Sequence, residues 1–419
     1  MAIAPFVELA HYLQSYSVTK KKEVLYVPCS QVNLPRSINY GQGSFKTVGE
    51  EVKKVGNKAL IISDQVMYDL GLVKECHSYL EEKGVTYFDY LGVRSEPTDH
   101  YVHEALELIQ TNKCDVIIAL GGGSCIDTAK AVAVLATNGG EISDYVQDKT
   151  TATDNPLPLV AIPTTAGTGS EATDVTVITN TKTDVKMMIK QQAFMPEIAI
   201  VDPYLTITSP KSTTAATGVD ALTHALEAYI SKKAHAFTDD LALSAIKRIT
   251  EHILEAYQNG ENVEARDEMI YASMQAGMAF SNSSVCLVHG MSRPIGALFH
   301  VPHGISNAML LPAVLEYSKV ECRERLAEIG LYLFPELKRL TELELSEKVV
   351  HTVLSLCKQL DIPNLKDWGV GEEEFNTALD KMADDALESG SPANNPKVPT
   401  KEEIISLYET AFGYEYAHV

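Results

Sequence analysis

Asp220 and several histidines in the second half of this chain have the types and spacing of a divalent-metal site. Asp220 and His224 are four positions apart in the segment 217–229, whose helical pattern places both side chains on one face. The stretch 287–304 then brings three more imidazoles, those of His289, His300 and His303. A carboxylate with three imidazoles suits Fe(II) or Zn(II) and leaves an open position for a substrate.

The local pattern distinguishes the three histidines of the stretch 287–304. His289 lies in a helical run, and His303 follows Pro302 at the start of another predicted helix. His300 lies between these helices, where we expect it to line the pocket or contact a substrate. The predicted metal ligands are therefore Asp220, His224, His289 and His303.

Arg293 lies four residues after His289 and is expected to face the same cleft. Arginine stays protonated at any pH that an enzyme meets, so it cannot relay a proton as histidine can. Three roles remain open: an ion pair with an acid such as Glu227, a contact with the pyrophosphate of a cofactor, or a contact with an anionic group of a substrate. Arg293 and His300 are the candidate catalytic or substrate-binding residues. Glu227 shares the helical face of His224 and is expected to orient a metal ligand.

A glycine-rich loop follows the apolar run 115–121 and precedes a helical segment. The backbone N–H groups of Gly122 and Gly123 can approach an anion closely, and the helix N-terminus adds a favourable dipole. Ser124 is the expected N-cap, with Asp127 three positions on, as in a capping box. A plain tight turn is the alternative, but the place between a buried strand and a helix favours a phosphate-binding loop.

A second loop, 161–173, follows another buried run and is rich in small hydroxyl residues. The hydroxyls of Thr164, Thr165 and Thr168 can bond a phosphate or a carboxamide, and two such loops after neighbouring strands fit a dinucleotide. Asp64 ends the run 58–64, where a carboxylate can accept both hydroxyls of an adenosine ribose and repel a 2′-phosphate. This predicts NAD rather than NADP. The alternative role for Asp64 is a helix cap.

Strand-type runs and helical segments alternate up to about residue 207. Apolar runs of this kind suit a parallel sheet that is buried on both faces; the strand candidates are 58–64, 85–92, 115–121 and 159–163. The alternation predicts an α/β dinucleotide-binding domain over residues 1–207. The later pattern is helical and predicts an all-helical metal-binding domain over 208–419, with the boundary in the stretch 201–211.

Composition excludes several classes of partner. The chain has 35 basic and 56 acidic residues, a net charge of −21, which disfavours nucleic acid and anionic membranes. No apolar run reaches the roughly 18–20 residues of a membrane span. Residues 1–22 lack a signal-peptide pattern and indicate a short amphipathic helix. Seven cysteines without a CxxC pair favour reduced thiols and a cytoplasmic location.

The motifs together resemble those of the iron-containing alcohol dehydrogenases. "GGGSCIDTAK", "AIPTTAGTGSEAT", "DPYLT", "TGVDALTHALEAY" and "HGMSRPIGALFHVPHG" stand in that order along the chain. The resemblance runs from about Asn39 to the end, so residues 1–38 look like an N-terminal extension. It implies a two-domain dehydrogenase with NAD(P) in the cleft and one divalent metal, usually iron. It also implies a homo-oligomer, a dimer or a larger assembly.

Carried over by position, the resemblance implies the same four metal ligands. The cofactor positions that it implies are Asp64, the loop from Gly122 to Asp127, Thr164, Thr165, Thr168 and Lys186. NAD-preferring members similarly carry an aspartate at the position of Asp64. Many members have a histidine where this chain has Arg293, and that histidine is often proposed to relay protons, so the resemblance leaves the relay open here.

The residues and the resemblance together predict reversible hydride transfer between a primary alcohol and NAD. Short aliphatic alcohols and substrates of the propanediol or lactaldehyde type are all compatible with the sequence. Through Arg293, an anionic aldehyde of the semialdehyde or phosphonate type is an alternative. Two further alternatives are a dehydroquinate synthase-like lyase, which shares the architecture, and a non-catalytic dinucleotide-binding protein.

Overall fold

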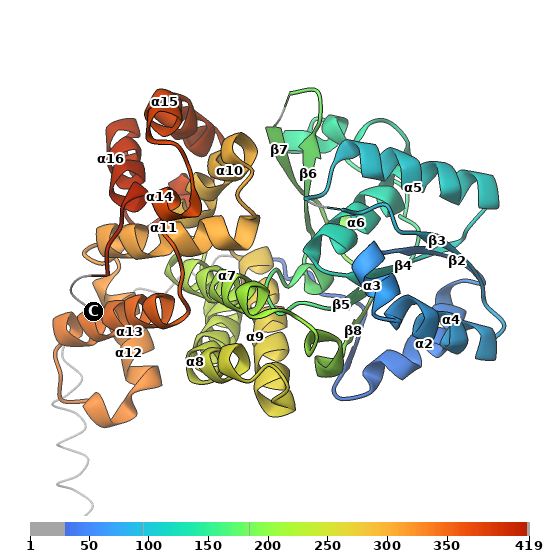
Figure 1. Cartoon of the computed structure of the whole chain (residues 1–419), viewed down its shortest axis with the longest axis horizontal. Helices are drawn as coiled ribbons and strands as arrows, with labels where there is room; N and C mark the ends of the chain where they lie inside the picture. Colours follow the sequence, from blue (N-terminus) through green and yellow to red (C-terminus); the bar gives the residue numbers. More distant parts are fainter. Residues whose placement is uncertain (1–29, 95, 184, 417–419) are drawn as a thin grey trace, which may run out of the picture. The chain divides into compact units, whose positions relative to one another are not determined.

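Six strands form the central sheet in the order β1-β8-β5-β4-β2-β3 (Figure 1). All neighbouring strands in it run parallel. The strands are β1 (Ser37–Tyr40), β2 (Lys58–Ile62), β3 (Thr86–Tyr90), β4 (Val116–Gly121), β5 (Leu159–Pro163) and β8 (Ile198–Val201). This computed structural model describes residues 30–94, 96–183 and 185–416, so the helix predicted for residues 1–22 lies outside the described residues.

Both faces of the sheet are covered, as the apolar runs predict. Alternate residues of a strand point to opposite faces, and β4 is buried along its whole length. Ile117 packs in one apolar cluster with residues of α5 and α6, whereas Ile118 packs in another with residues of α2 and α4. The covering helices are α2 (Val48–Val55), α3 (Gln65–Asp69), α4 (Leu72–Glu82), α5 (Asp99–Asn112) and α6 (Gly123–Asn138).

The strand order reverses direction between β2 and β4. From β2 the chain moves outward to β3, returns to β4 on the other side of β2, and then continues to β5. In open parallel sheets, ligands bind beyond the carboxyl ends of the strands at such a reversal. Asp64 follows β2 and Gly122 follows β4, so two of the predicted cofactor positions flank this point.

A β-hairpin that the sequence analysis did not identify lies outside the main sheet. Strands β6 (Val175–Asn180) and β7 (Val185–Lys190) pair antiparallel and form a sheet of their own. Figure 1 shows the hairpin beside helix α10, and β7 contacts that helix. Lys186, predicted only through the family resemblance, therefore belongs to a strand that reaches the helical half.

In the described residues that follow β8, all regular secondary structure is helical. This confirms the predicted fold class. The main helices of this half are α7 (Lys211–Ile230), α8 (Ala236–Gln258), α9 (Val263–Asn282), α10 (Leu287–Phe299), α11 (His303–Ser318), α12 (Arg323–Leu333), α13 (Glu342–Gln359), α14 (Leu365–Trp368), α15 (Glu372–Glu388) and α16 (Lys401–Phe412). Residues Asn33–Val419 form one compact unit, so the helical half packs directly on the sheet half.

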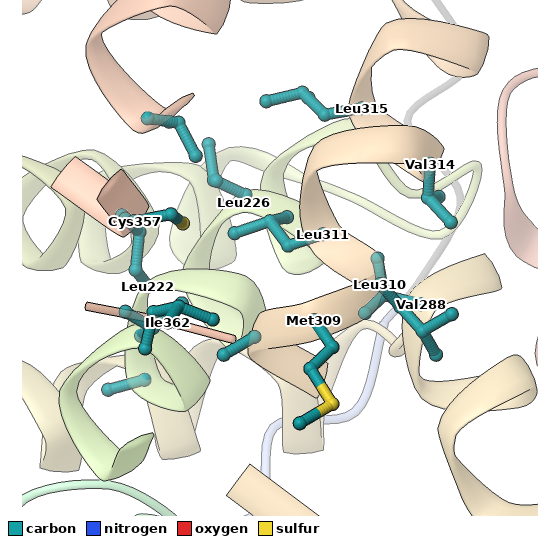
Figure 2. Close-up of a cluster of buried hydrophobic side chains, with 14 of the residues drawn as sticks. Leu222, Leu226, Val288, Met309, Leu310, Leu311, Val314, Leu315, Cys357 and Ile362 are labelled. Atoms are coloured by element: carbon teal, nitrogen blue, oxygen red, sulfur yellow. The ribbon is translucent and has the colours of Figure 1, made fainter. Parts of the chain in front are cut away.

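Helix α7 is the centre of the helical half. Leu222 and Leu226 of α7 lie with Val288, Leu310 and Leu311 in one apolar cluster (Figure 2). The opposite face of α7 is buried as well, because every residue from 218 to 230 is enclosed. A helix buried on all sides cannot leave polar groups to water, so each of its polar side chains requires a partner.

Two further features concern the length and polarity of the helices and the state of the cysteines. In the described part of the chain, no helix combines the length and the apolar character needed to cross a membrane. Six of the seven cysteines lie in that part, and all six are buried and free of disulfide bonds.

Candidate metal and cofactor site

The four predicted metal ligands lie together at the contact of three helices. Asp220 and His224 are one turn apart on α7, His289 lies in the first turn of α10, and His303 is the first residue of α11. One ligand atom from each lies within 4.8 Å of the others. The rings of His224 and His289 stack with centroids 4.3 Å apart. Residues far apart in the sequence thus present a carboxylate and three imidazoles to one point.

The polar atoms at this point fit a bound cation. His224 Nδ1 and His289 Nε2 are buried and have no hydrogen-bond partner in the part of the chain that the structure describes. Burial lowers the pKa of His289 to about 3 and that of His224 well below its ordinary value, so both rings are neutral. Burial also raises the pKa of Asp220 to about 7. A divalent cation would accept the lone pairs of both nitrogens and favour the ionised carboxylate.

Glu227 orients His289 in the way that its place on α7 predicts. One carboxylate oxygen accepts hydrogen bonds from His289 Nδ1 at 2.7 Å and from the backbone N–H of Cys286 at 2.8 Å. The other accepts from the N–H of Val288 at 2.6 Å. Because Nδ1 is engaged, the ring presents Nε2 to Asp220, whose carboxylate oxygen lies 3.7 Å away.

Two polar residues that complete the site were missed in the sequence analysis. Asn307, one turn after His303 on α11, donates to Asp220 Oδ1 at 2.7 Å and lies 3.2 Å from His303 Nε2. The spacing of four residues between His303 and Asn307 was the available signal. Glu96 accepts from the backbone N–H of His303 at 3.2 Å and from Lys186 Nζ at 3.2 Å. It lies in the connection after β3, and no local pattern marks it.

The two predicted cofactor loops lie against each other. A Cβ at Gly123 would lie 2.7 Å from Thr168 Cγ2, and one at Gly122 would lie 3.5 Å from Thr165 Oγ1. Thr164 donates its backbone N–H to Gly121 O at 3.1 Å, and its buried hydroxyl has no partner among the described residues. The glycines therefore allow the threonine loop to approach the start of α6. No side chain in the described part of the chain caps that helix, so its first N–H groups remain available for an anion.

The predicted capping pair at α6 is wrong. The N-cap is Gly122, and Ser124 lies inside the first turn. The Asp127 carboxylate points away from the helix start, because it accepts from Ser170 Oγ at 2.5 Å and from the N–H of Val177 at 2.8 Å. Asp127 thus ties the second loop and the β6–β7 hairpin to α6, and its carboxylate bonds protein groups.

Asp64 has the geometry of both roles considered for it. It is the N-cap of α3, and its Oδ1 accepts from the N–H of Met67 at 2.9 Å. Its Oδ2 lies 3.7 Å from Cys125 Sγ and 3.6 Å from the position of a Cβ on Gly121. One oxygen caps the helix while the other borders the glycine-rich loop.

The second loop also reaches the metal ligands. Burial lowers the pKa of His224, and the nearby backbone of Gly167 opposes that shift; a Cβ on Gly167 would lie only 2.5 Å from Thr217 Cβ on α7. Gly169 contacts α9 so closely that a Cβ on Gly277 would lie 2.6 Å from its carbonyl oxygen. The loop that carries the predicted cofactor threonines therefore packs directly on the helices of the metal site.

Arg293 and His300 differ in position from the metal ligands. Of the three roles left open for Arg293, the ion pair with Glu227 is not formed; Arg293 Nη2 instead donates to Ser391 Oγ at 3.1 Å and contacts Met188 Sδ at 3.0 Å. The Glu227 oxygens are already occupied by three other N–H groups, which explains the difference. His300 is exposed, ends α10 with a positive φ of 53°, and is not part of the four-residue group.

Comparison with known proteins gives consistent matches over the whole compact unit. The family model described as "Iron-containing alcohol dehydrogenase" matches residues 35–203, and that described as "Fe-containing alcohol dehydrogenase family, C-terminal" matches residues 214–412. The 1,3-propanediol dehydrogenase of Citrobacter freundii is 38% identical over 89% of this chain and 96% of its own length. The NAD-dependent methanol dehydrogenase of Bacillus methanolicus is 37% identical over 90% of this chain and 98% of its own. The crystal structure of a 1,3-propanediol oxidoreductase superposes with a TM-score of 0.87 at 37% identity, over 92% of this chain and 100% of the other.

The metal-ligand assignment predicts different outcomes for two histidines only three residues apart. His303→Ala removes one of four donors, so we expect the purified protein to lose most of its metal to a chelator that the wild type resists. His300→Asn, whose side chain tolerates the positive φ, should keep the metal. Metal content after dialysis against the chelator is the measurement. Loss of metal from His300→Asn with retention by His303→Ala would contradict the assignment.

Proposed function

This chain belongs to the iron-containing alcohol dehydrogenase family and is therefore an alcohol dehydrogenase; we propose that it transfers a hydride reversibly between a short primary alcohol and NAD. Alcohols of the propanediol type are the first candidates, because two of the relatives described above are named for that substrate. Iron(II) is the proposed metal, and zinc(II) is compatible with the same ligand types.

One observation carries the proposal. Two buried ring nitrogens, His224 Nδ1 and His289 Nε2, have no hydrogen-bond partner among residues 30–94, 96–183 and 185–416 and share one point with the Asp220 carboxylate. The loop after β5 contacts His224 through Gly167 and borders the glycine-rich loop through Thr168. A metal ion held at this point would supply a Lewis acid next to the dinucleotide site, which is the arrangement that hydride transfer between an alcohol and NAD requires.

The chain's own residues position the reactants. When bound, the metal supplies a Lewis acid that lowers the pKa of an alcohol, and NAD supplies the hydride acceptor. Glu227 fixes the ring of His289, and Asn307 fixes the Asp220 carboxylate by donating to it. Glu96 fixes the first N–H of α11 and thereby the backbone of His303. Arg293 keeps its proton at neutral pH, so the proton of the alcohol leaves by a path that does not use this side chain as a relay.

The cofactor contacts remain part of the proposal. The backbone N–H groups of Gly122 and Gly123 at the uncapped start of α6 suit the pyrophosphate. The residues proposed to contact the rest of the dinucleotide are Asp64, Ser124, Thr164, Thr165, Thr168 and Lys186. We assign Asp127 an indirect role, since its carboxylate holds the second loop in place.

The remaining assignments rest on coarser support. We propose a dinucleotide-binding domain over residues 1–207 and a metal-binding domain over 208–419, supported by the change from strands to helices between β8 and α7. Residues 1–38 are proposed as an extension, since the family model begins at residue 35. Free, buried cysteines support a reducing cytoplasm. A homodimer or larger homo-oligomer is proposed from the family resemblance alone.

The activity itself is tested with protein purified without oxygen and analysed for metal. We expect steady NADH formation with 1,3-propanediol or 1-propanol, loss of activity after chelation, and recovery when Fe(II) is returned. Steady turnover also separates this function from a lyase that uses NAD only transiently. A protein that binds NAD and metal but forms no NADH with any primary alcohol would contradict the proposal.

The preference for NAD is tested at Asp64 with a substitution that keeps the helix cap. Asparagine caps a helix about as well as aspartate but carries no charge, so Asp64→Asn should remove only the repulsion of a 2′-phosphate. We expect the ratio of kcat/KM with NADPH to that with NADH to rise about 10- to 100-fold, given repulsion on the order of a few kcal/mol. Asp64→Ala, which also loses the cap, measures the cost of the cap. If the ratio is unchanged in Asp64→Asn, Asp64 serves α3 alone.

A further inference from the structure

A cavity of about 360 Å³ lies between the β6–β7 hairpin, the segment Ile142–Asp148, α10 and α15. Three cationic side chains line it: Lys186 and Lys190 from β7 and Arg293 from α10. The function proposed above gives Lys186 a contact with the cofactor but assigns no role to Lys190 or Arg293. The cavity borders α10, and the same helix carries His289 of the proposed metal site.

Two of these three cations already have acidic partners. Lys186 pairs with Glu96 at 3.2 Å, and Lys190 pairs with Asp174 at 3.3 Å. Arg293 differs, because it forms no ion pair with any residue that the structure describes. Its hydrogen-bond donors reach only a hydroxyl and a thioether, those of Ser391 and Met188. A thioether sulfur is a weak acceptor, so much of the donor capacity of this guanidinium is unused.

Arg293 is partly buried in this cavity, and a charge withdrawn from water without an anionic partner is costly. Burial lowers the pKa of Arg293 to about 10, which still leaves it protonated at neutral pH. Glu227 adds a favourable field, but its oxygens bond Cys286, Val288 and His289. An anion that enters the cavity would supply the missing partner.

Two of the residues that line the cavity are connected to residues of the proposed metal site. Arg293 is one helical turn from His289, and residues so spaced have Cβ atoms about 5–6 Å apart. Lys186 lines the cavity and pairs with Glu96, which accepts the N–H of His303. Arg293 and Lys186 are thus the cavity residues closest in connectivity to His289 and His303, although none of the four proposed ligands lines the cavity itself.

Three acidic residues also line the cavity, but each is exposed or paired, which limits its repulsion of an anion near Arg293. Asp385 pairs with Lys381, and Asp148 and Glu388 are exposed. Exposed charges are screened by salt over about 8–10 Å, whereas a partly buried guanidinium is screened much less. The deeper part of the cavity thus remains favourable for an anion.

We propose that this cavity is the substrate pocket and that Arg293 binds the anionic end of the substrate, a short aldehyde bearing a carboxylate, sulfonate or phosphonate. The planar guanidinium fork matches two oxygens of such a group. In the reduction, NADH gives a hydride to the carbonyl carbon and the oxygen takes up one proton, so the products are the primary alcohol and NAD⁺. The inference rests on the proposed function and, among primary alcohols and their aldehydes, places those with an anionic end ahead of the neutral propanediol type.

The test compares charged and neutral aldehydes of matched length in the metal-loaded enzyme. The pair is succinic semialdehyde against pentanal, with sulfoacetaldehyde and phosphonoacetaldehyde as further charged substrates. We expect the wild type to favour a charged aldehyde, and Arg293→Gln to lower kcat/KM for it about 10- to 150-fold, mainly through KM. Pentanal should change less than about three-fold. Arg293→Lys should recover part of the charged-substrate activity.

The control is Arg339→Gln, which makes the same change in net charge at an exposed site. It should leave both substrates unaffected. An equal loss for charged and neutral aldehydes in Arg293→Gln would overturn the inference, as would a wild type that prefers pentanal to every charged aldehyde.

A direct binding measurement separates this inference from the proposed function. The NAD complex of the wild type should bind 4-hydroxybutyrate, the alcohol product of succinic semialdehyde, more tightly than that of Arg293→Gln. If neither aldehyde is reduced but this difference in affinity remains, the proposed function fails and the anion site stands. If both proteins bind the anion equally while pentanal is reduced, the anion site fails and the proposed function stands.

Discussion

One buried carboxylate, that of Glu227, joins the start of α10 to α7 and orients His289. It lies on α7, where water cannot reach it, and it receives N–H groups from the start of α10 and from the His289 ring. Hydrogen bonds to an ionised acceptor are stronger than neutral ones, and the N-terminus of a helix favours negative charge. Without these donors the buried charge would be strongly destabilising. The same contacts fix the direction of His289, so the packing of α10 on α7 and the geometry of the metal site have one cause.

Close backbone approaches then join this helical group to the sheet. Gly169 and Gly277 bring the loop after β5 onto α9, and Gly167 brings it onto α7. Gly304, the residue after His303, lets α11 begin close to α7, since a Cβ there would lie 3.1 Å from Ala216 O. Side chains at these positions would push the elements apart. The contact between the loop after β5 and the proposed metal ligands therefore depends on glycines as much as on polar groups.

Features that depend on neighbouring residues in the sequence were mostly predicted. Alternating apolar runs predicted the buried parallel sheet, and the spacing of Asp220 and His224 predicted one face of α7. Contacts between segments far apart in the chain produce no local sequence pattern, so they were not predicted. Glu96 reaches His303 across 207 residues, and the β6–β7 hairpin follows a loop of small residues that resembles a continuing turn. The predicted capping pair at α6 was wrong because the Asp127 carboxylate accepts hydrogen bonds from Ser170 and Val177 instead. Of the three roles open for Arg293, the pairing with Glu227 is not formed, since two backbone N–H groups and the His289 ring already bond the carboxylate.

The central claim is that a metal is held by four donors whose geometry Glu227 maintains. The most direct measurement is the dissociation constant of Fe(II) or Zn(II) for Glu227→Gln, with Glu251→Gln, an exposed acid paired with Lys247, as the control. Loss of a group that orients a metal-bound histidine typically weakens the metal about 10- to 100-fold. We predict a weakening in that range for Glu227→Gln with the helical circular dichroism unchanged, and no change for Glu251→Gln. A folded Glu227→Gln protein that binds the metal as tightly as the wild type would contradict the account.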